Sequence, residues 1–600
     1  MKFFCNPLNV NYRYQFNADP RRHGELQICR EAADPSMILF KGRYYIFASM
    51  TLGVWVSDDL AYWENHRLPD TLPLYDYAPD VRVIGDWVYF CASSRDYNCD
   101  RWRTQDILNG PYEKLEGNFP FWDPNLFLDD DGRVYFYWGC SNVTPIYGVE
   151  LDPETMNPKT EPKALVEGHP FKIGYERFGE NNSLLPATEE EIDAQVKAFH
   201  EAQGIPKSMI PKEVMPLIRG MFSNRPYIEG AWMDKHEGMY YLQYAAPGTQ
   251  YNTYSDGVYV SDSPLGAFTL AKNNPYSYKP GGFLPGAGHG STMEDKEGAL
   301  WHTATMRISK NHDFERRVGL WRAGFDADGE LFCNQRYGDW PMNVEELQKD
   351  PWCDPKWMLL SVWKPVTASS FVPGHEPECA SEENVQTWWR ASSNSRDEWL
   401  KLDLGEVQNV HAVQVNFADD KIDIPCPGEI RHGSQARYID EASHVTQWKL
   451  EGSTDGESWF VIADKSEAES DLSHDLVVSE EGFAARYLRL SDMAVPYAQN
   501  PCVSGLRVFG LGHGKKPHGP RYAVERVEDL DMMVDISDQP DALGWNILFG
   551  ESPDKLYHSY MVFAAGPRRV GALIRDRDYY VRVDVFNENG ITEGVCIRLQ

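Results

Sequence analysis

The chain has 600 residues, a formal net charge of −32, and 42% hydrophobic residues. This hydrophobic content suits packed cores and excludes a disordered chain, while the acidic balance without a Lys/Arg-rich run argues against a nucleic-acid partner. No window holds the roughly 18 apolar residues of a membrane span, and the length predicts two or three domains.

The N-terminal segment and the cysteines bear on the cellular compartment. Residues 1–16 contain no apolar segment followed by a small-residue cleavage site. The 11 cysteines are scattered without a C-x-x-C pair, which favours reduced thiols over a disulfide framework. We therefore expect a cytoplasmic protein, or a secreted or periplasmic one if a leader has been removed. No feature fixes the oligomeric state.

Five stretches share one pattern: a polar or acidic residue, an apolar run, a Gly-containing turn and an aromatic-rich second strand. They begin at Ala33, Ala78, Trp122, Ile228 and Gly288. Units of four strands at about 40–50 residues are typical of propeller blades. The sequence therefore predicts an all-β protein in which residues 1–345 form a five-bladed β-propeller, with another all-β fold of regular hairpins as the alternative.

A helical insertion at about residues 155–225 explains the long step to the fourth repeat. Thr188 and Glu191 form a capping box. Ile192, Val196 and Phe199 lie on one face of the expected helix, and Gly204 marks its end. This insertion lies just before Glu229 in the chain.

The sequence pattern of the C-terminal half predicts two further β-domains. A new all-β pattern covers about residues 361–513, and a Gly/Pro/Lys linker runs over residues 512–520. Residues 520–600 show the short alternating strands of a β-sandwich. The predicted fold is thus a five-bladed β-propeller followed by two β-sandwich domains.

Acidic residues recur where the first strand of a repeat begins. The first strands of propeller blades line the central axis, so Asp34, Asp123 and Glu229 should meet there although they are far apart in sequence. Crowded carboxylates raise at least one pKa. Glycoside hydrolysis needs one protonated carboxyl and one ionised carboxylate. Asp80 also begins a repeat, and its role is either structural or substrate-binding.

These motifs together resemble glycoside hydrolase family 43. Residues 33–36 (ADPS) look like its first-blade motif, residues 122–127 (WDPNLF) like its third, and residues 228–231 (IEGA) like its general-acid motif, with Ala231 where Pro is commoner. Residues 77–81 (YAPDV) are similar to the second-blade signature, with Tyr77 where Trp is commoner. The resemblance covers roughly residues 25–340.

The resemblance implies a role for each acid. Asp34 would be the catalytic base that activates water, Glu229 the general acid, and Asp123 the residue that raises the pKa of Glu229 and orients it. The implied reaction is a single displacement with inversion, which needs acid and base carboxyls about 6.5–9.5 Å apart. No cofactor is required for this chemistry.

Other positions are candidates for substrate or metal binding. Trp55, Trp122 and Trp232 could stack on sugar, although a propeller core also uses aromatic residues. The resemblance places Arg307 as a substrate contact, with an ordinary ion pair as the alternative. It places His289 by a structural calcium held mostly by water, since calcium prefers oxygen ligands; a hydrogen-bonded core histidine is the alternative.

The two C-terminal domains also resemble known modules. Residues 364–370, 387–393, 398–406 and 450–460 look like parts of a discoidin, or coagulation-factor C-type, galactose-binding-like sandwich. An extra stretch at about residues 419–444 interrupts that pattern. Such domains often bind glycans, and a spacer that packs on the propeller is the alternative. Residues 520–600 look like a fibronectin type III sandwich with a structural role.

The combined prediction is an exo-acting, inverting glycosidase that removes terminal β-xylosyl or α-L-arabinofuranosyl residues from plant cell-wall oligosaccharides or polysaccharides. Its partner would be a carbohydrate, without nucleic acid or membrane. Two alternatives stay open: a β-galactosidase or galactofuranosidase of the same fold, and a non-catalytic glycan-binding protein.

Overall fold

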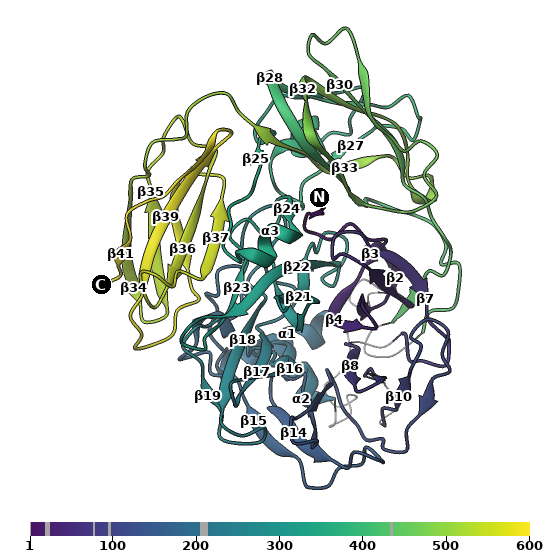
Figure 1. The fold of residues 1–600 in the computed structure, drawn as a ribbon, viewed down its shortest axis with the longest axis vertical. Coiled ribbons are helices and arrows are strands. Elements are labelled where there is room, and N and C mark those ends of the chain that lie inside the picture. The colour runs from purple at the N-terminus through teal and green to yellow at the C-terminus, as the bar shows by residue number, and fades with distance from the viewer. Residues whose placement is uncertain (1, 19–24, 76–77, 94–97, 204–213, 432–435) are drawn as a thin grey trace.

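A computed structural model of the chain describes residues 2–18, 25–75, 78–93, 98–203, 214–431 and 436–600, and most of its elements are β-strands (Figure 1). Within this part, residues 33–334 form five four-stranded antiparallel sheets, each built from consecutive strands. The sheets are β4–β7 (Ala33–Phe40, Arg43–Ser49, Gly53–Ser57, Glu64–Arg67), β8–β11 (Asp80–Ile84, Trp87–Cys91, Arg101–Thr104, Glu113–Lys114), β12–β15 (Asn125–Leu128, Val134–Trp138, Ile146–Leu151, Lys163–Val166), β16–β19 (Glu229–His236, Met239–Ala246, Ser255–Ser261, Thr269–Leu270) and β20–β23 (Gly288–Glu294, Leu300–Arg307, Arg316–Phe325, Leu331–Asn334).

The first strands of the five sheets form a closed ring. β4 contacts β8, β8 contacts β12, β12 contacts β16, β16 contacts β20, and β20 returns to β4. Sheets arranged radially around an axis make a β-propeller, so the predicted five-bladed propeller is confirmed (Figure 1). β1 (Phe3–Phe4) pairs with β24 (Met342–Asn343), next to α3 (Val344–Lys349), which ties the N-terminal segment to the chain after the last blade.

Both faces of a blade are buried, which explains the continuous apolar runs in the sequence. In β5, Tyr44 and Ile46 belong to one hydrophobic cluster, whereas Tyr45 and Phe47 belong to another. Successive side chains of a strand point to opposite faces, so each strand supplies the packing on both sides of its blade.

The predicted helical insertion lies between β15 and β16. It contains the 3₁₀ turn η2 (Gly174–Glu176), α1 (Glu189–Gln203) and α2 (Met215–Met221). The capping box is present, because the Thr188 N–H donates to Glu191 Oε2 at 2.8 Å and the Glu191 N–H to Thr188 Oγ1 at 3.3 Å. Ile192 and Val196 pack against α2. Gly204 and Tyr77, which the sequence analysis singled out, lie outside the described residues.

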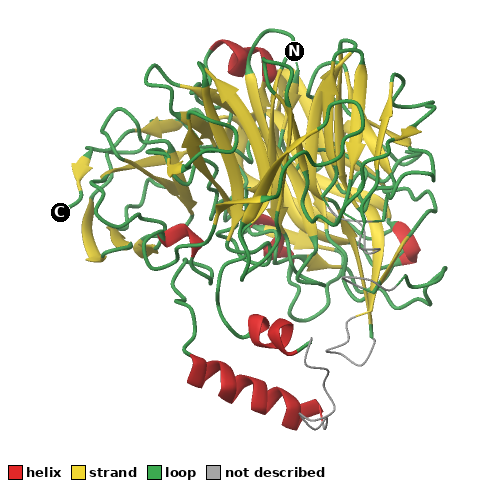
Figure 2. Ribbon diagram, turned by 90° about the horizontal axis from the view of Figure 1, so that it is seen from below, coloured by secondary structure: helices red, strands yellow, loops and turns green. Residues whose placement is uncertain are grey.

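The two helices stand away from the strands, beyond one face of the molecule (Figure 2). The loop of Asn142, which follows β13, fastens them to the propeller, since its side-chain amide donates to the carbonyl of Gly220 at 2.9 Å. Among the described helices, none combines the length and the apolar character needed to cross a bilayer.

The second domain is built on one large, bent antiparallel sheet around its own core. Its strands are β25 (Met358–Leu359), β26 (Val366–Ala368), β27 (Trp389–Arg390), β28 (Leu400–Phe417), β30 (Gln447–Ser453), β31 (Phe460–Asp464), β32 (His474–Ala494) and β33 (Cys502–Leu511), with 3₁₀ turns η4 (Pro377–Ser381) and η5 (Pro496–Ala498). The extra stretch of this domain contributes β29 (Arg437–Ile439), which pairs with β2 (Arg13–Ala18) and, through it, β3 (Leu26–Glu31).

The last domain has two sheets, as predicted for a β-sandwich. β34 (Tyr522–Glu528), β35 (Asp531–Ile536) and β38 (Gly566–Val570) form one; β36 (Gly544–Gly550), β37 (His558–Val562), β39 (Tyr580–Asn587), β40 (Gly590–Thr592) and β41 (Ile597–Arg598) form the other. Its assignment to the fibronectin type III family stays a prediction.

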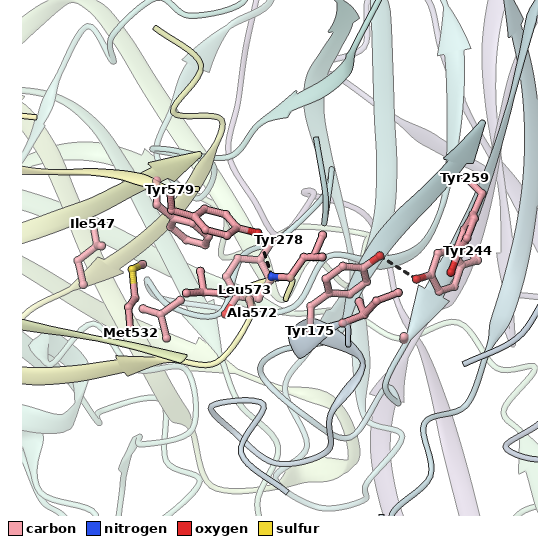
Figure 3. Close-up of a cluster of buried hydrophobic side chains, with 14 of the residues drawn as sticks. Tyr175, Tyr244, Tyr259, Tyr278, Met532, Ile547, Ala572, Leu573 and Tyr579 are labelled. Atoms are coloured by element: carbon pink, nitrogen blue, oxygen red, sulfur yellow. Dashed lines mark hydrogen bonds between the residues drawn. The ribbon is translucent and has the colours of Figure 1, made fainter. Parts of the chain in front are cut away.

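This sandwich shares a hydrophobic cluster with the fourth blade. Tyr244 and Tyr259 of that blade, Tyr175 of η2, and Met532 and Leu573 of the sandwich all belong to the cluster (Figure 3). The hydroxyl groups of Tyr175 and Tyr244 lie 2.7 Å apart. The sandwich is therefore packed on the propeller through η2.

Candidate active site

The backbone at the start of the inner strands repeats from blade to blade. One residue per blade has a left-handed conformation, with φ of 51° at Asp34, 51° at Ala78, 50° at Asp123, 62° at Gly230 and 52° at His289. Such a conformation costs about 1–3 kcal/mol for most residues and concentrates at functional sites. The five positions are therefore structurally equivalent and surround one end of the axis.

The strand register is shifted at the same points. It shifts between Ala33 and Ser36 in the first blade and between Glu229 and Trp232 in the fourth, and the fifth blade has a similar irregularity. A bulge of this kind bends its strand and redirects side chains.

His289 lies between two of the predicted catalytic acids. Its Nδ1 is 3.5 Å from Asp34 Oδ1 and 3.7 Å from Asp123 Oδ2. Gly230 allows this approach, because a Cβ there would lie 2.8 Å from Cγ of His289. The backbone N–H groups of His289 and Gly290 donate to the buried Asp256 at 2.7 and 3.0 Å, which fixes the histidine's loop.

Glu229 completes the group of acids. One ligand atom each of Asp123, Cys140 and Glu229 lies within 4.8 Å of the others. Glu229 Oε1 accepts a hydrogen bond from the Tyr254 hydroxyl at 2.5 Å, and Oε2 accepts from Cys140 Sγ at 3.2 Å. The structure thus brings together Asp34, Asp123, Glu229 and His289, as the sequence predicted.

Asp34 is buried but surrounded by groups that favour its ionised form. Ser49 Oγ donates to Asp34 Oδ2 at 2.8 Å, and Arg316 Nη1 lies 3.3 Å from Oδ1. Burial alone would raise the pKa of Asp34, but Arg316, His289 and the Ser49 hydrogen bond outweigh it and hold this pKa below its ordinary value. Asp34 is therefore a carboxylate at neutral pH.

Asp123 has the opposite electrostatic environment. Burial, together with the nearby charges of Glu229 and Asp34, raises the pKa of Asp123 to about 7, against the opposing effect of His289. Asp123, with Glu229 as its neighbour, therefore holds a proton near neutral pH.

The proposed substrate-binding residues have different surroundings. Trp122, next to Asp123, is 38% exposed and offers a ring to a ligand, whereas Trp55 and Trp232 are 1% and 4% exposed. Trp55 lies in the core between blades. The guanidinium of Arg82 stacks on Trp232, with Cζ of Arg82 3.3 Å from the centroid of the Trp232 ring. The structure therefore places Trp55 and Trp232 in the core, the alternative that the sequence analysis had left open.

Asp80 and Arg307 also have protein partners. The Asp80 carboxylate accepts hydrogen bonds from the Asn125 side chain at 3.0 Å and the Leu126 N–H at 2.7 Å, so it connects the second and third blades. Ala78, and not Asp80, is the second-blade equivalent of Asp34 and Asp123. Arg307 Nη1 lies 3.1 Å from Glu180 and donates to Asn252 at 2.6 Å. Substrate contacts by both residues stay predictions.

The surroundings of His289 bear on the predicted calcium. Its Nδ1 faces two carboxylates, which outweigh burial and raise the pKa of His289, so only the neutral form of the ring could bind an ion, through Nε2. Calcium takes 6–8 oxygen ligands, and one imidazole nitrogen supplies none of them. An ion beside His289 would therefore be held mainly by water, and the calcium itself stays a prediction.

Four residues around the acids were missed by the sequence analysis. Tyr254 immediately precedes the third strand of its blade, and Cys140 follows the second strand of another. Arg316 begins β22, and Arg437 comes from the second domain. The repeat pattern marks only the inner strands, so it carried no signal for these residues.

A propeller whose axis gathers an ionised carboxylate and a protonated carboxyl has the groups that glycoside hydrolysis requires. Residues 28–176 and 202–331 match the model of Glycosyl hydrolases family 43, and residues 380–490 match that of the NedA-like, galactose-binding domain. These matches support a family 43 glycosidase domain followed by a galactose-binding-like domain.

Relatives are similar at low identity. A beta-xylosidase of Xylanibacter ruminicola is 27% identical over 168 residues, which are 27% of this chain and 45% of the relative. A xylosidase/arabinosidase of Bacteroides ovatus is 26% identical over 272 residues, 40% of this chain and 76% of the relative. The chain thus spans under half the length of the first. A solved structure of a glycoside hydrolase is similar to this chain with 16% sequence identity and a TM-score of 0.43. The superposition covers 80% of this chain and 97% of the other chain.

Proposed function

We propose that the protein is an exo-acting, inverting glycosidase that removes terminal β-xylosyl or α-L-arabinofuranosyl residues from plant cell-wall oligosaccharides or polysaccharides. The observation that carries this proposal is the contrast between the buried carboxyls around His289. Asp34 is held in its ionised form, whereas Asp123, which neighbours Glu229, retains a proton near neutral pH.

Asp34 would act as the base. It would take a proton from a water molecule as that water attacks the anomeric carbon of the sugar. The positive charge of Arg316 keeps Asp34 ionised, and the hydrogen bond from Ser49 orients the carboxylate. A carboxylate fixed in this way needs little reorganisation when the reaction begins.

Glu229 would act as the acid. It would donate its proton to the glycosidic oxygen as the bond to the anomeric carbon breaks, and Asp123 beside it would orient its carboxyl group. The hydroxyl of Tyr254 would orient Glu229 through its hydrogen bond. Because water and leaving group occupy opposite faces of the sugar, the product would have the inverted configuration.

The helical insertion supports exo action. α1 and α2 stand beyond one face of the propeller (Figure 2), and their contact through Asn142 lies two residues from Cys140, which touches Glu229. An obstacle on this side would admit chain ends more readily than chain interiors. Release of monosaccharide alone from xylo- or arabino-oligosaccharides is expected; internal cleavage as the main reaction would contradict the exo part.

The choice of pentose rests on the names of the two relatives, a beta-xylosidase and a xylosidase/arabinosidase. A panel of aryl glycosides that differ only in the sugar would test it. We expect the highest kcat/KM for aryl β-D-xyloside or α-L-arabinofuranoside. Preference for a galactoside or galactofuranoside would contradict the proposed pentose specificity and favour the alternative sugar. The proposed reaction class, glycoside hydrolysis, would still stand.

Two variants test the reaction itself. Asp34→Asn and Glu229→Gln should each lower kcat on the preferred substrate by at least about 10³-fold, since each removes a group needed in the transition state. Asp535→Asn, on the last domain, is the control and should match the wild type. Sugar binding without turnover by the wild type would indicate the glycan-binding alternative.

A further inference from the structure

A strand of the second domain extends a small sheet that leads to Asp34. β29, from the extra stretch at residues 419–444, pairs with β2, and Arg437 lies opposite Asn17. β2 pairs in turn with β3, whose last residue is Glu31. Glu31 is three residues before Asp34 in the chain, so the second domain reaches the immediate neighbourhood of the proposed base.

Buried charges of alternating sign connect Arg437 with Asp34. Arg437 Nη1 is 3.0 Å from Glu31 Oε2, Arg316 Nη2 is 2.8 Å from Glu31 Oε1, and Arg316 Nη1 is 3.3 Å from Asp34 Oδ1. The side chains of these four residues are at most 4% exposed. Solvent screens such buried pairs only weakly. Removal of the charge of Arg437 therefore changes the electrostatic potential at Asp34.

The same stretch also packs beside the second support of Asp34. Ile439 is buried in a cluster with Met50 and Leu52, directly after Ser49. Ser49 is the residue whose hydroxyl donates to Asp34. Arg13, on β2, donates to the carbonyl groups of Thr51 and Asp440 and thereby joins this loop to the stretch. Contacts from the second domain therefore reach both residues that support the Asp34 carboxylate, Arg316 and Ser49.

We infer that Arg437 is a positioning residue for catalysis supplied by the second domain, which acts through Glu31 and Arg316 to hold Asp34 as an oriented carboxylate. This inference rests on the proposed role of Asp34 as the base. It means that the extra stretch is part of the catalytic apparatus and not only a spacer between domains.

The direction of the effect follows from the charges around Asp34. The titratable groups that face it are Arg316 from β22, His289 from β20, and, at longer range, Arg437, Glu31, Asp123 and Tyr254. In a variant without Arg437, Glu31 keeps its ion pair with Arg316 but loses the one with Arg437. The negative charge of Glu31 then attracts Arg316 more strongly and draws the Arg316 guanidinium away from Asp34. The Asp34 carboxylate then has less positive charge beside it, and its pKa rises.

The experiment compares Arg437→Met and Arg437→Lys with the wild type in the full-length protein. Arg437→Met should move the acidic limb of the kcat/KM profile upward by about one pH unit, a tenfold loss of activity on that limb. Arg437→Lys should restore most of the loss. Arg489→Met, which breaks an ion pair with Glu451 elsewhere in the second domain, is the control and should leave the profile unchanged.

A second readout separates this inference from the proposed function. The titration of Asp34, followed by NMR of protein with ¹³C-labelled aspartate and assigned with Asp34→Asn, does not require turnover. A higher Asp34 pKa in Arg437→Met supports the inference even if no substrate is cleaved. An unchanged Asp34 titration in folded Arg437→Met and Arg437→Lys, or equal loss of activity at every pH, would overturn it.

Discussion

At the scale of single residues, the site depends on two carboxyls with the same chemistry and opposite protonation. Asp34 and Asp123 have the same backbone conformation on different blades, and both face His289. Of the two, Asp34 has Arg316 beside it, whereas Asp123 has Glu229 as its neighbour. Environments that push two pKa values apart assign the roles of base and acid.

The pH dependence of activity should reflect this contrast. Hydrolysis needs Asp34 ionised, so kcat/KM should fall as the pH drops through the Asp34 pKa, which lies below its ordinary value of 3.8. It also needs Asp123 protonated beside the acid, so kcat/KM should fall as the pH rises through about 7, the pKa of Asp123. A bell-shaped profile with these limbs is expected. Full activity at pH 9 would contradict the account.

At the scale of elements, the left-handed residue at the start of each inner strand places the acids. In the fourth blade the left-handed position is Gly230, and the acid, Glu229, precedes it by one residue. The offset brings Glu229 toward Tyr254 and Cys140 on neighbouring strands and leaves space for the His289 ring. A side chain at Gly230 would fill that space.

Gly230→Ala should therefore damage the site more than the fold. The new Cβ would meet the His289 ring at 2.8 Å, and displacement of a catalytic group by about 1 Å can cost about 100-fold in rate. Gly238→Ala is a matched control in the same blade: its φ of 83° carries a similar conformational cost, but nothing lies within 4 Å. Steady-state kinetics should show the large loss in kcat/KM only for Gly230→Ala. Equal activity of the two variants would contradict this role of Gly230.

The sequence predicted the elements that repeat and missed those that do not. The five hairpins revealed the blades, and the capping box at Thr188 predicted the start of α1, because both patterns depend on neighbours in the chain. Asp80 was aligned with Asp34, although the left-handed backbone at Ala78 makes Ala78 the true equivalent. Tyr254, Arg316 and Arg437 approach the acids only through tertiary structure, so local patterns carried no information about them.

At the scale of the whole molecule, both C-terminal domains are built onto the propeller. The second domain contributes β29 and buried charges on one side. The last domain shares a hydrophobic cluster with the fourth blade on another (Figure 3), and Gly174 of η2 donates its N–H to the carbonyl of Leu573 at 2.8 Å. The propeller is thus held by both domains, and the likeness of the second to galactose-binding domains does not by itself imply a separate binding role.

Gly174→Ala tests the attachment of the last domain. A Cβ there would lie 2.3 Å from the carbonyl oxygen of Gly571 and 2.5 Å from that of Leu573, so we expect a loss of about 1–3 kcal/mol in the free energy of unfolding. Gly519→Ala, which meets nothing within 4 Å, is the control. Calorimetry should show a lower or split transition for Gly174→Ala alone, and identical transitions for both variants would contradict a tight interface.

The central claim is that Asp34 and Glu229 act on opposite sides of a glycosidic bond, and the configuration of the first sugar released tests it most directly. Proton NMR during the first minutes of hydrolysis of the preferred aryl pentoside distinguishes the two anomers before they equilibrate. The account predicts that the new sugar has the configuration opposite to that of the substrate. Release of the sugar with its configuration retained would contradict it.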